Sequence, residues 1–131
     1  KRYLGAGKRG DVRMHWPELA TVVGWIRDAQ GIAVVAHPLR YGMTRRKRDL
    51  MFSAFIEAGG EAAELVSGYQ NPDTTHDLAR QLDFHGLYGS IGSDFHYPGG
   101  ALSPGTISPP PRSHVKPVWC HPSLRGFACG E

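Results

Sequence analysis

The stretch IAVVAH, residues Ile32 to His37, decides the fold of this chain. It is short, apolar and rich in β-branched side chains, which is typical of a strand covered on both faces in a parallel sheet. A polar residue, His37, stands at its C-terminal end. We therefore expect His37 to lie at the edge of the sheet where parallel strands end.

Helical and strand patterns alternate on both sides of this stretch. Apolar residues at helical spacing predict a helix over residues 17–30, before the strand. Thr44 is a candidate N-cap for a second helix, which precedes the apolar strand AAELVS at 62–67. Asp73 is a candidate N-cap for a third helix, followed by the strand LYGSIGSDFH at 87–96. This alternation predicts an α/β fold with a parallel sheet.

The chain changes character from Tyr97 onward. This region is rich in Pro, Gly and Ser, which predicts an irregular loop or tail. The predicted strands form a small parallel sheet whose edges stay unpaired unless further strands join them. The first residue is Lys1 rather than Met. We therefore expect the chain to begin inside a longer protein.

Length and composition set broad limits on function. A length of 131 residues and a hydrophobic content of 40% fit one domain with a packed core. The formal charge of +3 is compatible with an anionic substrate without requiring nucleic acid. No apolar run approaches the roughly 20 residues that cross a bilayer. The spacing of Cys120 and Cys129 matches no common zinc or redox motif, so we expect reduced thiols in a cytoplasmic protein.

Polar residues follow each predicted strand. His37 follows the first strand, Ser67 ends the second, and Asp94 and His96 stand at the end of the third. Carboxylate and imidazole groups are ligands for zinc, manganese or iron, and Asp-x-His can direct both side chains to one side. We expect His37, Asp94 and His96 to form a metal site. The alternative is that His37 binds a backbone carbonyl group and Asp94 caps a turn.

Basic residues follow His37. Arg40 and Tyr41 share its edge of the sheet, and residues 45–48, RRKR, fall in the first turn of the second predicted helix. A helix N-terminus can bind phosphate, and Arg40 can contact two of its oxygens. The alternative for residues 45–48 is a solvated helix face. Glu64, inside an apolar strand, either supports the site from within or faces outward near an edge.

Three stretches, GIAVVAHPLRY, GGEAAELVSG and GSDFH, together resemble the PHP (polymerase and histidinol phosphatase) superfamily. The resemblance is to the bacterial branch of 5′-to-3′ exoribonucleases and nucleoside 3′,5′-bisphosphate phosphatases. It implies a distorted (β/α)7 barrel with two or three metal ions, manganese foremost, with zinc or iron as alternatives. By position, it implies metal ligands at His37, Asp94 and His96.

The resemblance also implies roles in binding and catalysis. Asp94 and His96 match the catalytic motif of the family. The residues that match its phosphate-contacting positions are Arg40, Tyr41, Lys8 and Arg13. The implied activity of the complete enzyme is metal-dependent hydrolysis of phosphate esters in nucleotides or short RNA. The alternative is a noncatalytic module that binds nucleotides or nucleic acid.

The chain departs from the family pattern in one respect. Family members begin with an H-x-H motif and further ligands, and no H-x-H occurs in this sequence. The chain therefore resembles the C-terminal half of a PHP domain, with residues 1–119 as the partial domain and 120–131 as a tail. Its expected partners are the missing N-terminal half and a phosphorylated substrate, with no membrane. The fragment alone is expected to be inactive.

Overall fold

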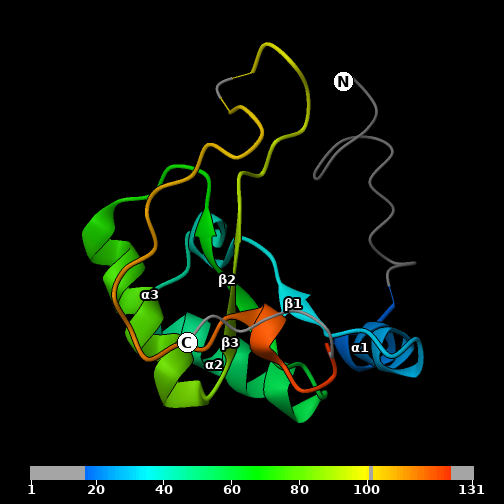
Figure 1. The fold of residues 1–131 in the computed structure, drawn as a ribbon. Coiled ribbons are helices and arrows are strands. Elements are labelled where there is room, and N and C mark those ends of the chain that lie inside the picture. Colours follow the sequence, from blue (N-terminus) through cyan, green and yellow to red (C-terminus); the bar gives the residue numbers. More distant parts are fainter. Residues whose placement is uncertain (1–16, 101, 125–131) are drawn as a thin grey trace, which may run out of the picture.

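A computed structural model describes residues 17–100 and 102–124 of the chain (Figure 1). Helices and strands alternate along the chain, in the order expected from the sequence. The elements are α1 (Leu19–Asp28), β1 (Val34–Val35), the short helix η2 (Pro38–Tyr41), α2 (Arg45–Glu57), β2 (Ala62–Ser67), α3 (Pro72–His85), β3 (Tyr88–Gly92) and η3 (Val118–Cys120).

The strands form one parallel sheet in the order β1-β2-β3. Val34 pairs with Ala62 on one side of β2, and Ala62 pairs with Tyr88 on the other. The register between β2 and β3 shifts between Glu64 and Val66. The expected α/β class with a parallel sheet is confirmed.

Several predicted element boundaries were wrong. The strand expected over residues 32–37 pairs only at Val34–Val35, and the last strand ends at Gly92 rather than at His96. The first helix is shorter than the expected 17–30, because it spans Leu19–Asp28. These differences place His37 and Asp94 in loops just beyond the strands.

The caps of the second and third helices are made by side chains. Thr44 caps α2 as expected, with its Oγ1 accepting a hydrogen bond from the backbone N–H of Lys47. Asn71, and not Asp73, caps α3; its side chain accepts hydrogen bonds from two backbone N–H groups, and Asp73 lies in the first turn. Pro72 at the first helical position accounts for this start, because its fixed φ suits that position.

The hydrophobic core joins all three long helices to β2. Val23 of α1, Phe52 of α2 and Leu78 and Leu82 of α3 are fully buried, and Val66 of β2 packs in the same cluster. Burying each such side chain contributes roughly 1.5–3 kcal/mol to stability. This core fixes β2 between its neighbours and so fixes the loops that follow the strands.

The segment after β3 is irregular, as the sequence predicts. Figure 1 shows it rising away from the sheet (yellow) and returning alongside α3 (orange). It rejoins the sheet where Pro117 bridges to Gly89. Cys120 is disulfide-bonded, so the expectation of a reduced thiol is wrong for this residue. Among the described residues, no helix is long and apolar enough to span a membrane.

Candidate functional site

The candidate site lies at the C-terminal ends of the strands, which we call the rim. β1 is followed by His37, β2 ends at Ser67, and β3 is followed by Asp94. The Arg40 guanidinium makes an ion pair with the Asp94 carboxylate and donates a 3.4 Å hydrogen bond to the Ser67 carbonyl oxygen. Residues at or just beyond the ends of three separate strands therefore meet at one place, as the carboxyl ends of parallel strands require.

The backbone is strained at two of the predicted ligands. His37 has φ 34° and ψ 56°, and Asp94 has φ 53°. A residue with a side chain rarely adopts such values, and residues that do so cluster at functional sites. In the described part of the chain, the only other residue with a side chain and positive φ is Gln30, after α1. The strain therefore coincides with the predicted site.

Glu64 holds His37 in this conformation. The backbone N–H of His37 donates a hydrogen bond to Glu64 Oε2, with an N···O distance of 2.7 Å. A methyl group at Gly92 would lie 2.6 Å from Glu64 Oε1, so the glycine leaves room for the carboxylate. Glu64 was expected either to support the site from within or to face outward near an edge. The structure supports the first of these predictions, because the Glu64 carboxylate contacts His37. Gly92 was not predicted to belong to the site; its position directly before S-D-F-H was the available signal.

Two buried polar atoms at the rim have no hydrogen-bond partner within the described residues, His37 Nδ1 and Ser67 Oγ. Leaving such an atom unpaired costs about 1–3 kcal/mol. An imidazole nitrogen with no protein partner is available to a ligand. His37 therefore fits the chemistry of a metal-binding residue.

Asp94 and His96 lie against each other. His96 Nδ1 is 2.7 Å from the Asp94 backbone carbonyl oxygen and 3.7 Å from the Asp94 carboxylate. A carbonyl oxygen only accepts, so Nδ1 carries the proton and Nε2 of the neutral ring keeps its lone pair. The His96 side chain is 70% exposed. This tautomer is the one that a metal-binding Nε2 requires.

The structure does not gather all predicted ligands into one group. Over residues 17–100 and 102–124, no set of three or more His, Cys, Asp or Glu side chains is arranged to hold a metal ion. Asp94 and His96 are together, whereas the His37 ring lies next to the exposed Tyr41, with ring centroids 5.4 Å apart. The described residues therefore supply donors for a metal without forming a complete site.

The other predicted anion-binding residues divide into three groups. Lys8 and Arg13 lie outside the described residues. Arg45 and Arg48 both pair with Asp77 of α3, so they join α2 to α3. Residues 46 and 47 are exposed, as expected for a solvated helix face.

Comparisons with known proteins point to one group. No family model matches the chain. The chain is 44% identical over 121 residues to a 3′,5′-nucleoside bisphosphate phosphatase of Chromobacterium violaceum, covering 91% of this chain and 42% of that protein. It is 41% identical over 105 residues to a 5′-3′ exoribonuclease of Haemophilus influenzae, covering 80% of this chain and 38% of that protein.

A solved structure shares the fold. It is an amidohydrolase from Chromobacterium violaceum with bound sulfate and no metal, 42% identical, with a TM-score of 0.74 over 90% of this chain and 40% of that protein. The chain thus spans about two fifths of the length of the relatives it matches. This sequence and structural similarity to phosphatases and exoribonucleases agrees with the resemblance to the PHP superfamily that the sequence motifs indicate.

Proposed function

We propose that this chain is part of a metal-dependent phosphoesterase that hydrolyses phosphate esters of nucleotides or short RNA. The observation that carries the proposal is the contact of Arg40 with Asp94 at the rim, next to His96. It puts a cation suited to phosphate beside a carboxylate suited to a metal. The named activities of the relatives, a bisphosphate phosphatase and exoribonucleases, both cleave a phosphate ester of a nucleotide.

In this proposal the chain supplies the C-terminal part of a PHP barrel. Residues 1–119 form the partial domain and 120–131 a tail, of which His121 packs against Glu61 and Tyr88. A missing N-terminal half contributes the remaining metal ligands. The chain alone would then bind phosphate but turn it over inefficiently.

His37, Asp94 and His96 are the residues that would hold metal. The unpaired Nδ1 of His37, the carboxylate of Asp94 and the free Nε2 of His96 form a donor set that suits manganese, zinc or iron. We propose two or three ions in the complete enzyme, with manganese the first choice. A bound ion would supply an activated water near neutral pH and would neutralise charge on the phosphoryl group.

The chain's own residues orient the substrate and the ligands. The Arg40 guanidinium can leave Asp94 and contact two oxygens of the phosphoryl group, where it would neutralise charge that develops during hydrolysis. Tyr41 follows Arg40 in the chain, and its side chain is exposed to solvent. Lys8 and Arg13 are proposed as further phosphate contacts. Asp94 and His96 act together, because the Asp94 carbonyl oxygen fixes the orientation of the His96 ring.

A noncatalytic nucleotide-binding or nucleic-acid-binding module is the second candidate. It is favoured by the finding that no three-ligand metal group forms among residues 17–100 and 102–124. Titration of Mn²⁺ into the chain, followed by the electron paramagnetic resonance of free Mn²⁺, separates the candidates. The metal site is supported if Asp94→Asn weakens Mn²⁺ binding at least tenfold. The control variant Asp28→Asn, at an exposed position, should leave Mn²⁺ binding unchanged. Equal binding by all three proteins would favour the noncatalytic module.

We propose the cytoplasm as the compartment of this activity, because nucleotide and RNA substrates are abundant there. The disulfide at Cys120 is unusual for that compartment, where thiols are kept reduced. Thiol titration of protein purified under non-reducing conditions reports which state the chain adopts.

A further inference from the structure

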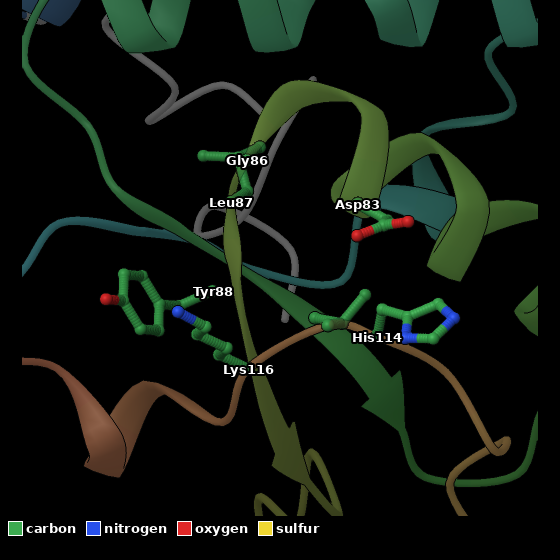
Figure 2. Close-up of a pocket in the computed structure, with 7 residues that line it drawn as sticks. Asp83, Gly86, Leu87, Tyr88, His114 and Lys116 are labelled. Carbon is green, nitrogen blue, oxygen red and sulfur yellow. The ribbon is translucent and has the colours of Figure 1, made fainter.

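A groove runs along the outer side of α3, between this helix and residues 112–116. It consists of two cavities of about 200 and 370 Å³, which share Asp83 and His114 in their walls. Figure 2 shows the first cavity, with His114 and Asp83 close together and Lys116 beside Tyr88. We call this feature the α3 groove; its charged and titratable walls are His76, Arg80, Asp83, Arg112, His114 and Lys116.

The outer wall of the groove is fixed at both ends. At the rim end, the Ser108 backbone N–H donates to the Gly68 carbonyl oxygen at 2.9 Å, and Ser108 Oγ accepts from the backbone N–H of Gln70. At the other end, the Gly89 backbone N–H donates to the Lys116 carbonyl oxygen at 2.9 Å. Residues 109–111 are prolines, which favour a stiff extended chain. The wall is therefore a built part of the fold.

The dimensions of the two walls agree. An extended segment rises about 3.1 Å per residue, so the eight steps from Ser108 to Lys116 span roughly 25 Å. The helix rises about 1.5 Å per residue, so α3 spans roughly 21 Å. The segment can therefore follow α3 over its whole length, as Figure 1 shows.

The groove is positively charged. Arg80, Arg112 and Lys116 are exposed, and none of them pairs with a carboxylate in the part of the chain that the structure describes. Asp83 is the single acidic residue among the groove walls. The nearby Asp77 is already neutralised by Arg45 and Arg48. A row of unpaired cations along a groove is suited to a ligand with regularly spaced negative charges.

The groove also leads toward the candidate site. Gly68 and Gln70, which hold its rim end, follow directly after Ser67, whose carbonyl oxygen accepts a hydrogen bond from Arg40. His76 lies in the half of α3 nearest this end, and Gly86 lies at the far end.

We propose that the α3 groove binds the phosphate backbone of single-stranded RNA whose terminal nucleotide is held at the rim. The identity of the ligand rests on the proposed function. From His76 to Gly86 the helix advances about 15 Å. A stacked strand has one phosphate per 3.4 Å or so, so the groove accommodates roughly four phosphates. Its unpaired cations contact these phosphates, and Tyr88 offers a ring against which a base can stack.

The test measures RNA binding without hydrolysis. A fluorescent 12-nucleotide RNA is titrated with protein in EDTA at several KCl concentrations, and binding is followed by anisotropy. Each phosphate contact contributes about −0.7 to the slope of log affinity against log salt for a single strand. The double variant Arg80→Gln/Lys116→Gln should therefore lose about 1.4 from the slope and on the order of tenfold in affinity at 50 mM KCl.

The matched control is Arg46→Gln/Lys47→Gln, which removes the same charges from the exposed start of α2. It should keep both the slope and the affinity. Affinity for a nucleoside 3′,5′-bisphosphate should be unchanged in the groove variant, because one nucleotide fills only the rim. An equal loss in the control variant would overturn the proposal, as would competition by polyglutamate as strong as that by unlabelled RNA. Groove-dependent RNA binding by a longer protein that contains this chain and releases no phosphate with Mn²⁺ present would overturn the proposed function alone.

Discussion

The carboxylate of Glu64, in the middle of β2, accepts a hydrogen bond from the backbone N–H of His37, with an N···O distance of 2.7 Å. This bond joins the central strand to a residue whose backbone is in the left-handed region. It therefore fixes the direction of the His37 side chain. The position of His37 in the candidate site thus depends on one carboxylate of the central strand.

Replacing Glu64 tests this relationship. Glu64→Ala removes the acceptor and should reduce the free energy of unfolding by about 1–3 kcal/mol, because a half-buried N–H loses its partner. Glu64→Gln keeps an acceptor oxygen and should retain most of that stability. Urea denaturation measures both, and Mn²⁺ titration should show weaker binding for Glu64→Ala. Equal stability of the two variants would mean that the bond does not hold His37.

Gly92→Ala tests the same carboxylate from the neighbouring strand. The added methyl group would lie 2.6 Å from Glu64 Oε1. Because that atom is the end of a flexible side chain, it should swing away and leave the His37 N–H, at a cost of about 1 kcal/mol. Gly24→Ala is the control, since no atom lies within 4 Å of the position of its added methyl group and alanine favours a helix. Amide exchange at His37 should become faster in Gly92→Ala only.

Arg40 should act on substrate rather than on metal. In a longer protein that hydrolyses a nucleoside 3′,5′-bisphosphate, Arg40→Ala should reduce kcat/KM by on the order of tenfold to a thousandfold, since one charge-neutralising group is lost. Arg40→Lys should restore part of this loss, because lysine keeps the charge but not the two-pronged geometry. Metal content, measured by atomic emission, should stay normal in both. Loss of metal in Arg40→Ala would show that its role is wrongly assigned.

Acid should weaken the contact between α2 and α3. Burial alone would raise the pKa of Asp49, but hydrogen bonds from Gln81 and His85 and nearby positive charge lower it overall below its ordinary value of 3.8. A lowered pKa in the folded state gives stability that is present above pH 3.8 or so and is lost as the pH falls through the folded-state pKa. The stability difference between the wild type and Asp49→Asn should therefore shrink between pH 5 and pH 3. Urea denaturation midpoints of both proteins, measured at pH 5 and pH 3, report this difference in stability. A difference that stays constant between the two pH values would contradict a contribution from the lowered pKa of Asp49.

Local patterns in the sequence predicted the alternation of helices and strands but not their ends. The run from Ile32 to His37 has strand composition throughout, yet only Val34–Val35 pair, because pairing depends on the partner strand. Asn71 and Asp73 can both cap a helix, and the position of Pro72 between them determines which one does.

The candidate site was predictable to a similar extent. Residues that follow strands were identified from the periodicity, and Arg40 was predicted to share the edge of the sheet with His37; its ion pair with Asp94 was not predicted. The hydrogen bond from the His37 N–H to Glu64, and the lack of a three-ligand metal group among the described residues, depend on side-chain directions in loops. Those directions are set by tertiary contacts, including the space left by Gly92, and no local pattern encodes them.

The most direct test of the proposed metal-dependent phosphoesterase is Asp94→Asn in a longer protein that contains this chain. Asn tolerates the left-handed backbone that Asp94 adopts, so the fold should survive, which circular dichroism checks. The variant lacks the negative charge that would hold the metal. Bound manganese and phosphate release from a nucleoside 3′,5′-bisphosphate are measured together. We expect loss of bound metal and a fall in phosphate release of at least a hundredfold, whereas full activity with normal metal content would contradict the account.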